Sequence, residues 1–202
     1  HKKAAEDYIS YYLEHFIDSQ TGLIEWGVHI SYNVYDDAFV HTEGHHHEIQ
    51  TILPIWPVLY SSSPEAMRSY LKQFWYYHTD RETGIVGRHP EKGEGCSFAM
   101  AAGEVALACA YLYLIENDEL WIERAKLIAD THWSSREPKT NLFANRLEPL
   151  GSDNTGDRFD LHSADTSIPG LWCSRVLLAG KITGCDEMVE MAETVLDAWV
   201  RY

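Results

Sequence analysis

The sequence predicts an all-α protein built of helical hairpins that follow one another around a ring. Three observations lead to this prediction: a segment of about 60 residues recurs along the chain, apolar residues recur at helical spacing, and short connections alternate with long ones. In such a ring an inner helix returns quickly to an outer one, and the long segments collect on one face. Because long loops usually carry function, we expect the functional site there.

The recurring unit is an aromatic-rich helix followed by Asp-x-x-Thr-Gly and two aliphatic residues. Its Thr-Gly step stands at Thr21-Gly22 and again at Thr83-Gly84. A fainter third copy has Thr140-Asn141 in that place. Asn replaces Gly where the backbone must be left-handed. The pattern therefore predicts a left-handed residue at this position of each copy.

Apolar spacing and start signals justify seven helices. The apolar residues are Tyr8, Tyr12, His15 and Phe16 in the first helix and Met67, Leu71, Phe74, Trp75 and His78 in the third. Ser63-Pro64 starts the third, with Ser as cap and Pro at the first helical position. Asn117-Asp118-Glu119 and Gly184-Cys185-Asp186 are similar starts. The second, fourth and sixth helices are more apolar all round and are placed inside. The expected helices are 2–17, 45–60, 64–79, 97–116, 118–134, 164–183 and 186–201.

The connections differ sharply in length. Short turns fall near 61–63, 116–118 and 184–185, whereas the polar segments 18–44, 80–96 and 135–163 are long. Alternating apolar and polar residues occur within 22–40, where Leu23–Trp26 and His29–Val34 suggest a small hairpin. The longest apolar run, Phe98–Ile115, contains Glu104 and fits a buried helix better than a membrane span.

Composition narrows the class of protein. The chain has 202 residues, with 16 basic and 31 acidic side chains and a net charge of −15. This charge argues against nucleic-acid binding, and no membrane partner is expected. The four cysteines form no CxxC pair, so neither a disulfide framework nor a thiolate zinc site is indicated. No signal peptide is visible; periplasmic, secreted and cytoplasmic locations stay open, as does the oligomeric state.

We expect one domain over residues 1–202 that holds about three and a half hairpins. A six-hairpin ring would need roughly twice this length at the same repeat spacing. The domain is therefore expected to be incomplete: a fragment, a smaller ring, or a ring completed by another chain.

Several motifs carry a resemblance to a known architecture. They are Gly27-Val-His29-x-x-Tyr32-Asn-Val-Tyr-Asp36-Asp37, Glu43-Gly-His45-His46-His47-Glu48, Pro64-Glu65-Ala66, Phe74-Trp75-Tyr-Tyr-His78 and Arg88-His89. Over about residues 5–115 the chain resembles the α/α-toroid carbohydrate-active enzymes. These include six-hairpin glycosidases, toroidal polysaccharide lyases of the pectate-lyase type and N-acylglucosamine 2-epimerase-like enzymes. The resemblance implies an α/α toroid and a substrate that contains uronate sugars.

The densest functional cluster is His41-Thr-Glu43-Gly-His45-His46-His47-Glu48. It lies where a long loop enters an inner helix, and a helix N-terminus offers free N–H donors and partial positive charge. We expect His45, His46 and His47 to bind sugar hydroxyls or carboxylates. A divalent metal held here stays an alternative, although HExxH is absent. No cofactor is otherwise expected. In a third interpretation these residues only brace the helix.

Four carboxylates are candidates for acid and base catalysis. Asp36 or Asp37 with Glu43 or Glu48 would supply the acid and the base that glycoside hydrolysis requires. The alternative for Asp36-Asp37 is a solvated turn.

A second group of candidates suits β-elimination. Arg88 and His89, in the repeat position of His29, would neutralise a uronate carboxylate. Tyr32 or a histidine would then remove the acidified C5 proton. The alternative is a loop salt bridge from Arg88 to Glu91 or Glu94. Further binding candidates on long segments are Trp26, His29, His162 and Asp165.

The function predicted from the sequence is cleavage of a glycosidic bond in a uronate-containing oligo- or polysaccharide. Acidic residues outnumber basic ones in the long loops, so hydrolysis is preferred to elimination. The same residues are also compatible with sugar epimerisation and with a non-catalytic glycan-binding module.

Overall fold

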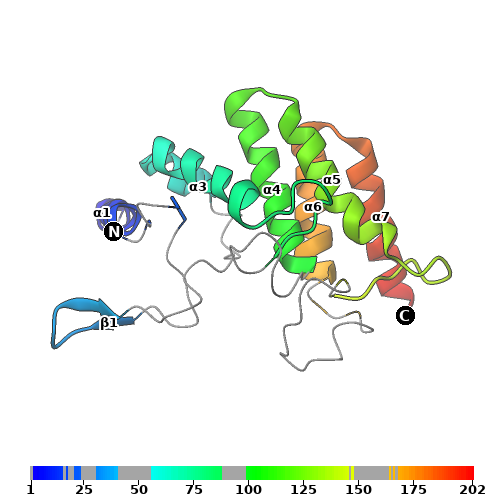
Figure 1. The fold of residues 1–202 in the computed structure, drawn as a ribbon, viewed down its shortest axis with the longest axis horizontal. Coiled ribbons are helices and arrows are strands. Elements are labelled where there is room, and N and C mark those ends of the chain that lie inside the picture. The colour runs from blue at the N-terminus through cyan, green and yellow to red at the C-terminus, as the bar shows by residue number, and fades with distance from the viewer. Residues whose placement is uncertain are drawn as a thin grey trace.

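A computed structural model of the chain describes residues 2–15, 17, 21–23, 31–40, 56–87, 99–145, 147, 164, 166 and 168–202. These residues form an all-α structure with a single short hairpin of strands among the described segments (Figure 1). The helices are α1 (Lys2–His15), α2 (Trp56–Ser62), α3 (Pro64–Tyr77), α4 (Ala99–Glu116), α5 (Leu120–Ser134), α6 (Ser174–Thr183) and α7 (Asp186–Arg201). A π-helix, η2 (Ile168–Cys173), leads directly into α6.

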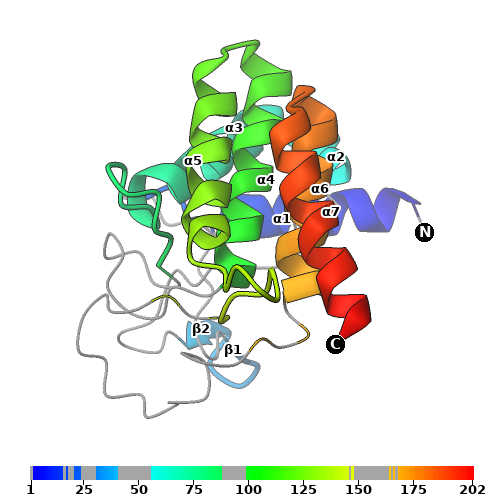
Figure 2. The ribbon, with the colours of Figure 1, turned by 90° about the vertical axis from the view of Figure 1, so that its right-hand side faces the viewer.

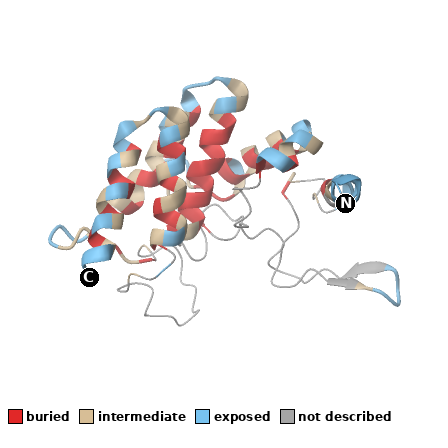
Figure 3. Ribbon diagram, turned by 180° about the vertical axis from the view of Figure 1, so that it is seen from behind, coloured by how far each residue is buried: buried red, intermediate tan, exposed pale blue. Residues whose placement is uncertain are grey.

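Helix α4 is the centre of the packing. It contacts α3, α5, α6 and η2, and its residues from Ala101 to Leu112 are all buried. It is long and apolar enough to cross a membrane, yet 72% of it is buried inside the protein. The expectation of a buried inner helix is therefore confirmed. In Figure 3 the buried residues lie on the facing sides of α4 and its neighbours, whereas most of α1 is exposed.

The outer helices α3, α5 and α7 repeat one burial pattern. Leu71 and Phe74 of α3 are fully buried, and so are Ala125 and Ile128 of α5, which stand 54 positions later in each case. Helix α7 buries Ala192 and Val195 in the same spacing. The helical part of the predicted repeat is thus present in the structure.

The turns that follow the outer helices also repeat, as the sequence predicts. Gly22 has a φ of 71°, Gly84 of 75° and Asn141 of 57°. In each copy the preceding threonine accepts a hydrogen bond from the backbone N–H two residues later. The N–H to Oγ1 distances are 3.2 Å at Thr21, 3.3 Å at Thr83 and 3.3 Å at Thr140. The asparagine therefore takes the backbone conformation of the two glycines.

The strand hairpin pairs different segments from the predicted one, and residues 24–26 of the first predicted strand lie outside the described residues. Strands β1 (Ser31–Asn33) and β2 (Ala38–Val40) pair antiparallel, with Tyr32 opposite Phe39. Leu23, predicted to be in a strand, lies outside any strand and is 1% exposed in the core. The turn chemistry explains the register, because the Asn33 side chain accepts hydrogen bonds from the N–H groups of Tyr35 and Asp36.

Several predicted helix limits are also corrected. The sixth helix was expected from residue 164, but regular helical structure begins at Ile168 as the π-helix η2. Pro169 fits this start, since proline suits the first turn of a helix, where its missing N–H has no partner to lose. Helix α2 continues to Ser62, so Ser63 alone separates it from α3, and the Ser63 side chain makes no capping hydrogen bond. Residues 45–55 of the expected second helix lie outside the described residues.

The short and the long connections between helices lie at opposite ends of the bundle, as far as the structure describes them. In Figure 2 the short connections α4–α5 and α6–α7 lie at one end of the bundle, and η2 and the start of α4 lie at the other. Three contacts draw the long segments to this second end. Thr131 Oγ1 donates to Thr83 O at 2.9 Å, Ala99 N–H donates to Asn145 O at 2.8 Å, and Phe143 packs against Trp172 at 4.9 Å between ring centroids.

Candidate functional site

The turn after α3 lines a concave surface among the described residues. Thr79 pairs with Val86 as an isolated antiparallel bridge, which closes the chain between them into a tight loop. A cavity of about 410 Å³ lies against the loop, and its described lining is Thr79, Asp80, Arg81 and Glu82. The loop ends at Gly87. The next residue in the chain is Arg88, which the sequence predicts to bind a substrate carboxylate.

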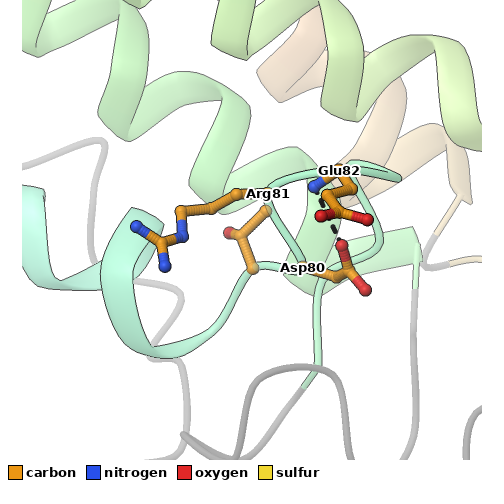
Figure 4. Close-up of a pocket in the computed structure, with 4 residues that line it drawn as sticks. Asp80, Arg81 and Glu82 are labelled. Atoms are coloured by element: carbon orange, nitrogen blue, oxygen red, sulfur yellow. Dashed lines mark hydrogen bonds between the residues drawn. The ribbon is translucent and has the colours of Figure 1, made fainter.

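The carboxylate of Asp80 organises this loop. Its Oδ1 accepts hydrogen bonds from the backbone N–H groups of Glu82, at 2.9 Å, and Thr83, at 3.1 Å (Figure 4). The bonds from Thr83 and Glu82 hold the pKa of Asp80 below its ordinary value. Figure 4 shows the Arg81 guanidinium pointing away from this carboxylate. Asp80 is thus a structural acceptor that keeps the loop in shape.

A buried cluster of aromatic side chains lies at the same end of the helix bundle. The ring of His132 in α5 packs edge-on against Phe143, with 5.5 Å between ring centroids. Its centroid lies 6.5 Å from that of Trp172 in η2. His132 is fully buried, and within the described part of the chain neither of its ring nitrogens has a hydrogen-bond partner. Burial alone lowers the pKa of this histidine from 6.5 to about 3. The imidazole therefore stays neutral in the folded protein at any ordinary pH.

We expect His132 to make the protein acid-sensitive. The unfolded chain binds a proton at this residue below about pH 6.5, whereas the folded protein does so only near pH 3. Stability is therefore fully present above about pH 6.5 and falls as the pH drops toward 3. Between pH 7.5 and pH 5 the group should remove about 2 kcal/mol from the free energy of unfolding.

Urea unfolding of the wild type and of His132→Phe at the two pH values measures this contribution. The variant keeps an aromatic ring against Phe143 and removes two unpaired nitrogens, so we expect it to gain about 1 kcal/mol at pH 7.5. Its stability should also depend less on pH. An identical pH dependence in both proteins would show that His132 does not titrate on unfolding.

The predicted acids Asp36 and Asp37 lie in the exposed turn between β1 and β2. Asn33 donates a side-chain hydrogen bond to the Asp36 carboxylate, and Asp37 has a positive φ of 50°. This is the geometry of a solvated turn, which the sequence analysis gave as the alternative to acid and base catalysis for these two residues. Tyr32 lies in β1, where its backbone pairs with Phe39.

The remaining predicted site residues lie outside the described part of the chain. They are Trp26, His29, Glu43, His45, His46, His47, Glu48, Arg88, His89, His162 and Asp165. Among the residues that the structure does describe, no group of three His, Cys, Asp or Glu side chains could hold a metal ion. A metal at the histidine cluster stays a prediction.

The inner helices contain a charged pair that the sequence motifs do not reveal. Glu104 of α4 is fully buried and accepts a 2.8 Å hydrogen bond from Arg175 Nε of α6. Burial raises the pKa of this carboxyl, and the Arg175 guanidinium opposes that shift. One signal was available, since Glu104 is the single charged residue inside the longest apolar run. Its partner stands 71 positions away and has no local signature.

Comparison with known proteins gives a family match and a similar relative. Residues 1–94 match the family model described as periplasmic pectate lyase. A pectate disaccharide-lyase of Dickeya dadantii (strain 3937) is 32% identical over 82 residues. That match covers 39% of this chain and 15% of the relative, so the chain spans a small part of the relative's length. The N-terminal half of the protein is therefore similar to pectate lyases.

Proposed function

We propose that the protein cleaves a uronate-containing polysaccharide of the pectate class by β-elimination. The observation that carries the proposal is the similarity of residues 1–94 to periplasmic pectate lyases. This segment includes the predicted basic pair Arg88-His89, the histidine cluster and Tyr32. Both matches name lyases, so elimination replaces hydrolysis as the preferred chemistry. The family description also favours a periplasmic location among those left open.

The chemistry requires three tasks. A cation must neutralise the uronate carboxylate, which makes the proton at C5 more acidic. A base then removes that proton, the C4–O bond to the leaving sugar breaks, and the leaving oxygen takes up a proton. Arg88 and His89 are the residues proposed for the first task, because guanidinium binds carboxylate through two parallel hydrogen bonds. Tyr32 or a histidine is proposed as the base.

The repeat supports the convergence of Arg88 with the histidine cluster. In the third copy the carbonyl of Asn145 accepts the N–H of Ala99, the first residue of inner helix α4. Asn145 follows Thr140 at the same interval as Arg88 follows Thr83. The α3-to-α5 spacing of 54 places the counterpart of Ala99 at about His45. By this equivalence Arg88 is predicted to lie beside the cluster His45–Glu48, at the N-terminus of the preceding inner helix.

The proposal is tested with Arg88→Ala assayed on polygalacturonate. Elimination creates a conjugated double bond, so ultraviolet absorbance of the product measures it directly, and a reducing-end assay counts all cleavage. We expect Arg88→Ala to lower kcat by about 100-fold or more, because one preorganised donor to the developing charge is typically worth that much. Arg201→Ala is the matched control, since Arg201 is an exposed arginine at the end of α7.

Three results would contradict the proposal in different ways. Reducing ends that form without ultraviolet absorbance would establish hydrolysis instead. Full activity of Arg88→Ala would remove Arg88 from the reaction. A wild type that binds polygalacturonate without cleaving it would favour the glycan-binding module.

A further inference from the structure

Arg175, at the start of α6, carries a guanidinium group that is held at two of its nitrogens. Its Nε donates to Oε1 of the buried Glu104 at 2.8 Å, and its Nη1 donates to Oγ of Ser174 at 3.2 Å. The Ser174 hydroxyl in turn donates to the carbonyl oxygen of Gly170 in η2 at 2.6 Å, so its oxygen acts as the acceptor toward the arginine. The plane of the guanidinium is therefore fixed before any ligand binds.

The guanidinium has more donors than these two bonds use. It carries five N–H groups, and within the described part of the chain two of them have partners. The others are on the terminal nitrogens Nη1 and Nη2, and a carboxylate binds such a pair through two parallel hydrogen bonds. The side chain of Arg175 is 15% exposed, so these terminal donors can meet a molecule from solution.

The surface beside Arg175 is open. Gly170 is exposed, and an added Cβ there would have none of the described residues within 4 Å. Leu171 and Leu178, about one helical turn before and after Arg175, are partly exposed and exposed, whereas Val176 faces the core. This side of the η2–α6 helix thus places one cation between two apolar side chains. A uronate sugar has the matching chemistry, because its ring offers C–H groups and its C6 carboxylate carries the charge.

The pairing with Glu104 favours a binding role over a purely structural one. A buried ion pair adds little net stability, because the desolvation of both charges offsets their attraction. Here the pair is uneven: Glu104 is fully buried, whereas Arg175 reaches the surface, and a single hydrogen bond joins them. On a chain with a net charge of −15, a polyanion also needs cations at fixed places to overcome the general repulsion.

We propose that Arg175 binds a carboxylate of the uronate polymer through its terminal nitrogens, with Glu104 and Ser174 holding the guanidinium in place. The proposal rests on the proposed function for the identity of this ligand. It adds a binding contact outside residues 1–94, the segment that matches the lyase family, and it assigns Arg175 no part in the chemical step.

Calorimetric titration with a galacturonate trimer tests the proposal. Replacing Arg175 alone would leave Glu104 uncompensated, so the comparison starts from Glu104→Gln, which keeps an acceptor for Nε. Adding Arg175→Met to this background removes the guanidinium and leaves no buried charge behind. We expect the Kd of the trimer to rise about 10- to 100-fold, the usual effect of losing hydrogen bonds to a charged group. The methyl-esterified trimer should bind equally to both proteins, because it carries no carboxylate.

Two further variants control for folding and for general charge. Lys181→Gln removes an exposed positive charge from the same helix and should leave the Kd unchanged. Arg175→Lys keeps a cation opposite Glu104 and lacks the planar pair of donors, so we expect it to fold and to bind the trimer about fivefold more weakly or worse. Circular dichroism verifies that each variant is folded. If the double variant does not fold, Arg175→Lys decides.

The outcomes separate this proposal from the proposed reaction. Equal trimer affinity with and without Arg175→Met, or wild-type affinity in Arg175→Lys, would overturn the role of Arg175, while ultraviolet-absorbing product from the wild type would uphold elimination. An equal loss of affinity for the methyl ester would overturn it as well, because the lost contact would not be to a carboxylate. So would a wild type that does not bind the trimer. A wild type that binds through Arg175 and releases no such product would uphold the contact and overturn elimination.

Discussion

Replacing Gly84 with alanine should lower the free energy of unfolding by about 3–5 kcal/mol, as strain and overpacking add. Gly84 has a φ of 75°, a conformation that is strained for a residue with a side chain. A Cβ atom there would stand 2.8 Å from both Cγ and the carbonyl oxygen of Leu127 and 2.9 Å from Thr131 Oγ1. Because the carbonyl is backbone of α5, the turn itself would have to move away from the helix.

Two other glycines of positive φ separate the contribution of backbone strain from that of overpacking. Gly184 has a φ of 70° with nothing within 4 Å of an added Cβ, so its alanine variant should show strain alone, about 1–2 kcal/mol. At Gly22 the nearest atom is Gln73 Cγ at 3.2 Å, on a flexible side chain, which predicts an intermediate loss. Guanidinium unfolding of the three variants gives the order. Equal losses at Gly84 and Gly184 would show that packing on α5 adds nothing.

The repeat turns were predictable because their determinants are local. The Asp-x-x-Thr-Gly pattern needs a threonine hydroxyl to accept a nearby N–H and a residue that tolerates positive φ. Both requirements are met within a few residues, so the fainter copy at Thr140-Asn141 was identified from the sequence as well. The outer helices were predictable for a similar reason, since one apolar face at helical spacing is a property of the segment itself.

The pairing of the strands and the π-helix were harder to predict from the sequence. Leu23 fits an alternating pattern as well as it fits the core, and only tertiary packing places it there. At η2, Gly103 of α4 lets the two helices approach closely: an added Cβ would lie 2.9 Å from the carbonyl oxygen of Leu171. Such a long-range contact leaves no trace in the local pattern.

The candidate site was predicted in composition more than in geometry. The sequence selected Arg88-His89 and the histidine cluster by residue type, and their arrangement stays a prediction. It also selected Asp36 and Asp37, whose exposed turn shows how adjacent acids in a loop suit both catalysis and solvation. His78 was identified only as a member of an apolar face, because the bond of its ring to the Gly87 carbonyl depends on how the loop returns to the helix.

The second large effect is expected from Arg175→Met. The substitution keeps much of the apolar stem and removes the guanidinium that pairs with Glu104 at 2.8 Å. Glu104 is fully buried, and among the residues that the structure describes its Oε2 already has no hydrogen-bond partner. Removing one partner of a buried ion pair typically costs about 3–5 kcal/mol, because the other charge is left uncompensated. We expect a loss of this size at pH 8.

The loss should diminish on acidification, and this dependence identifies its cause. Burial raises the pKa of Glu104, and without Arg175 nothing opposes that shift. A carboxyl whose pKa is raised on folding contributes stability below its unfolded pKa of about 4.3 and loses it as the pH rises through the folded value. The unfolding free energy of Arg175→Met should therefore fall between pH 5 and pH 8. The same substitution in a Glu104→Gln background should cost much less and show little extra pH dependence. A large loss that persists there unchanged would mean that lost packing of the arginine stem, and not the uncompensated carboxylate, destabilises the variant.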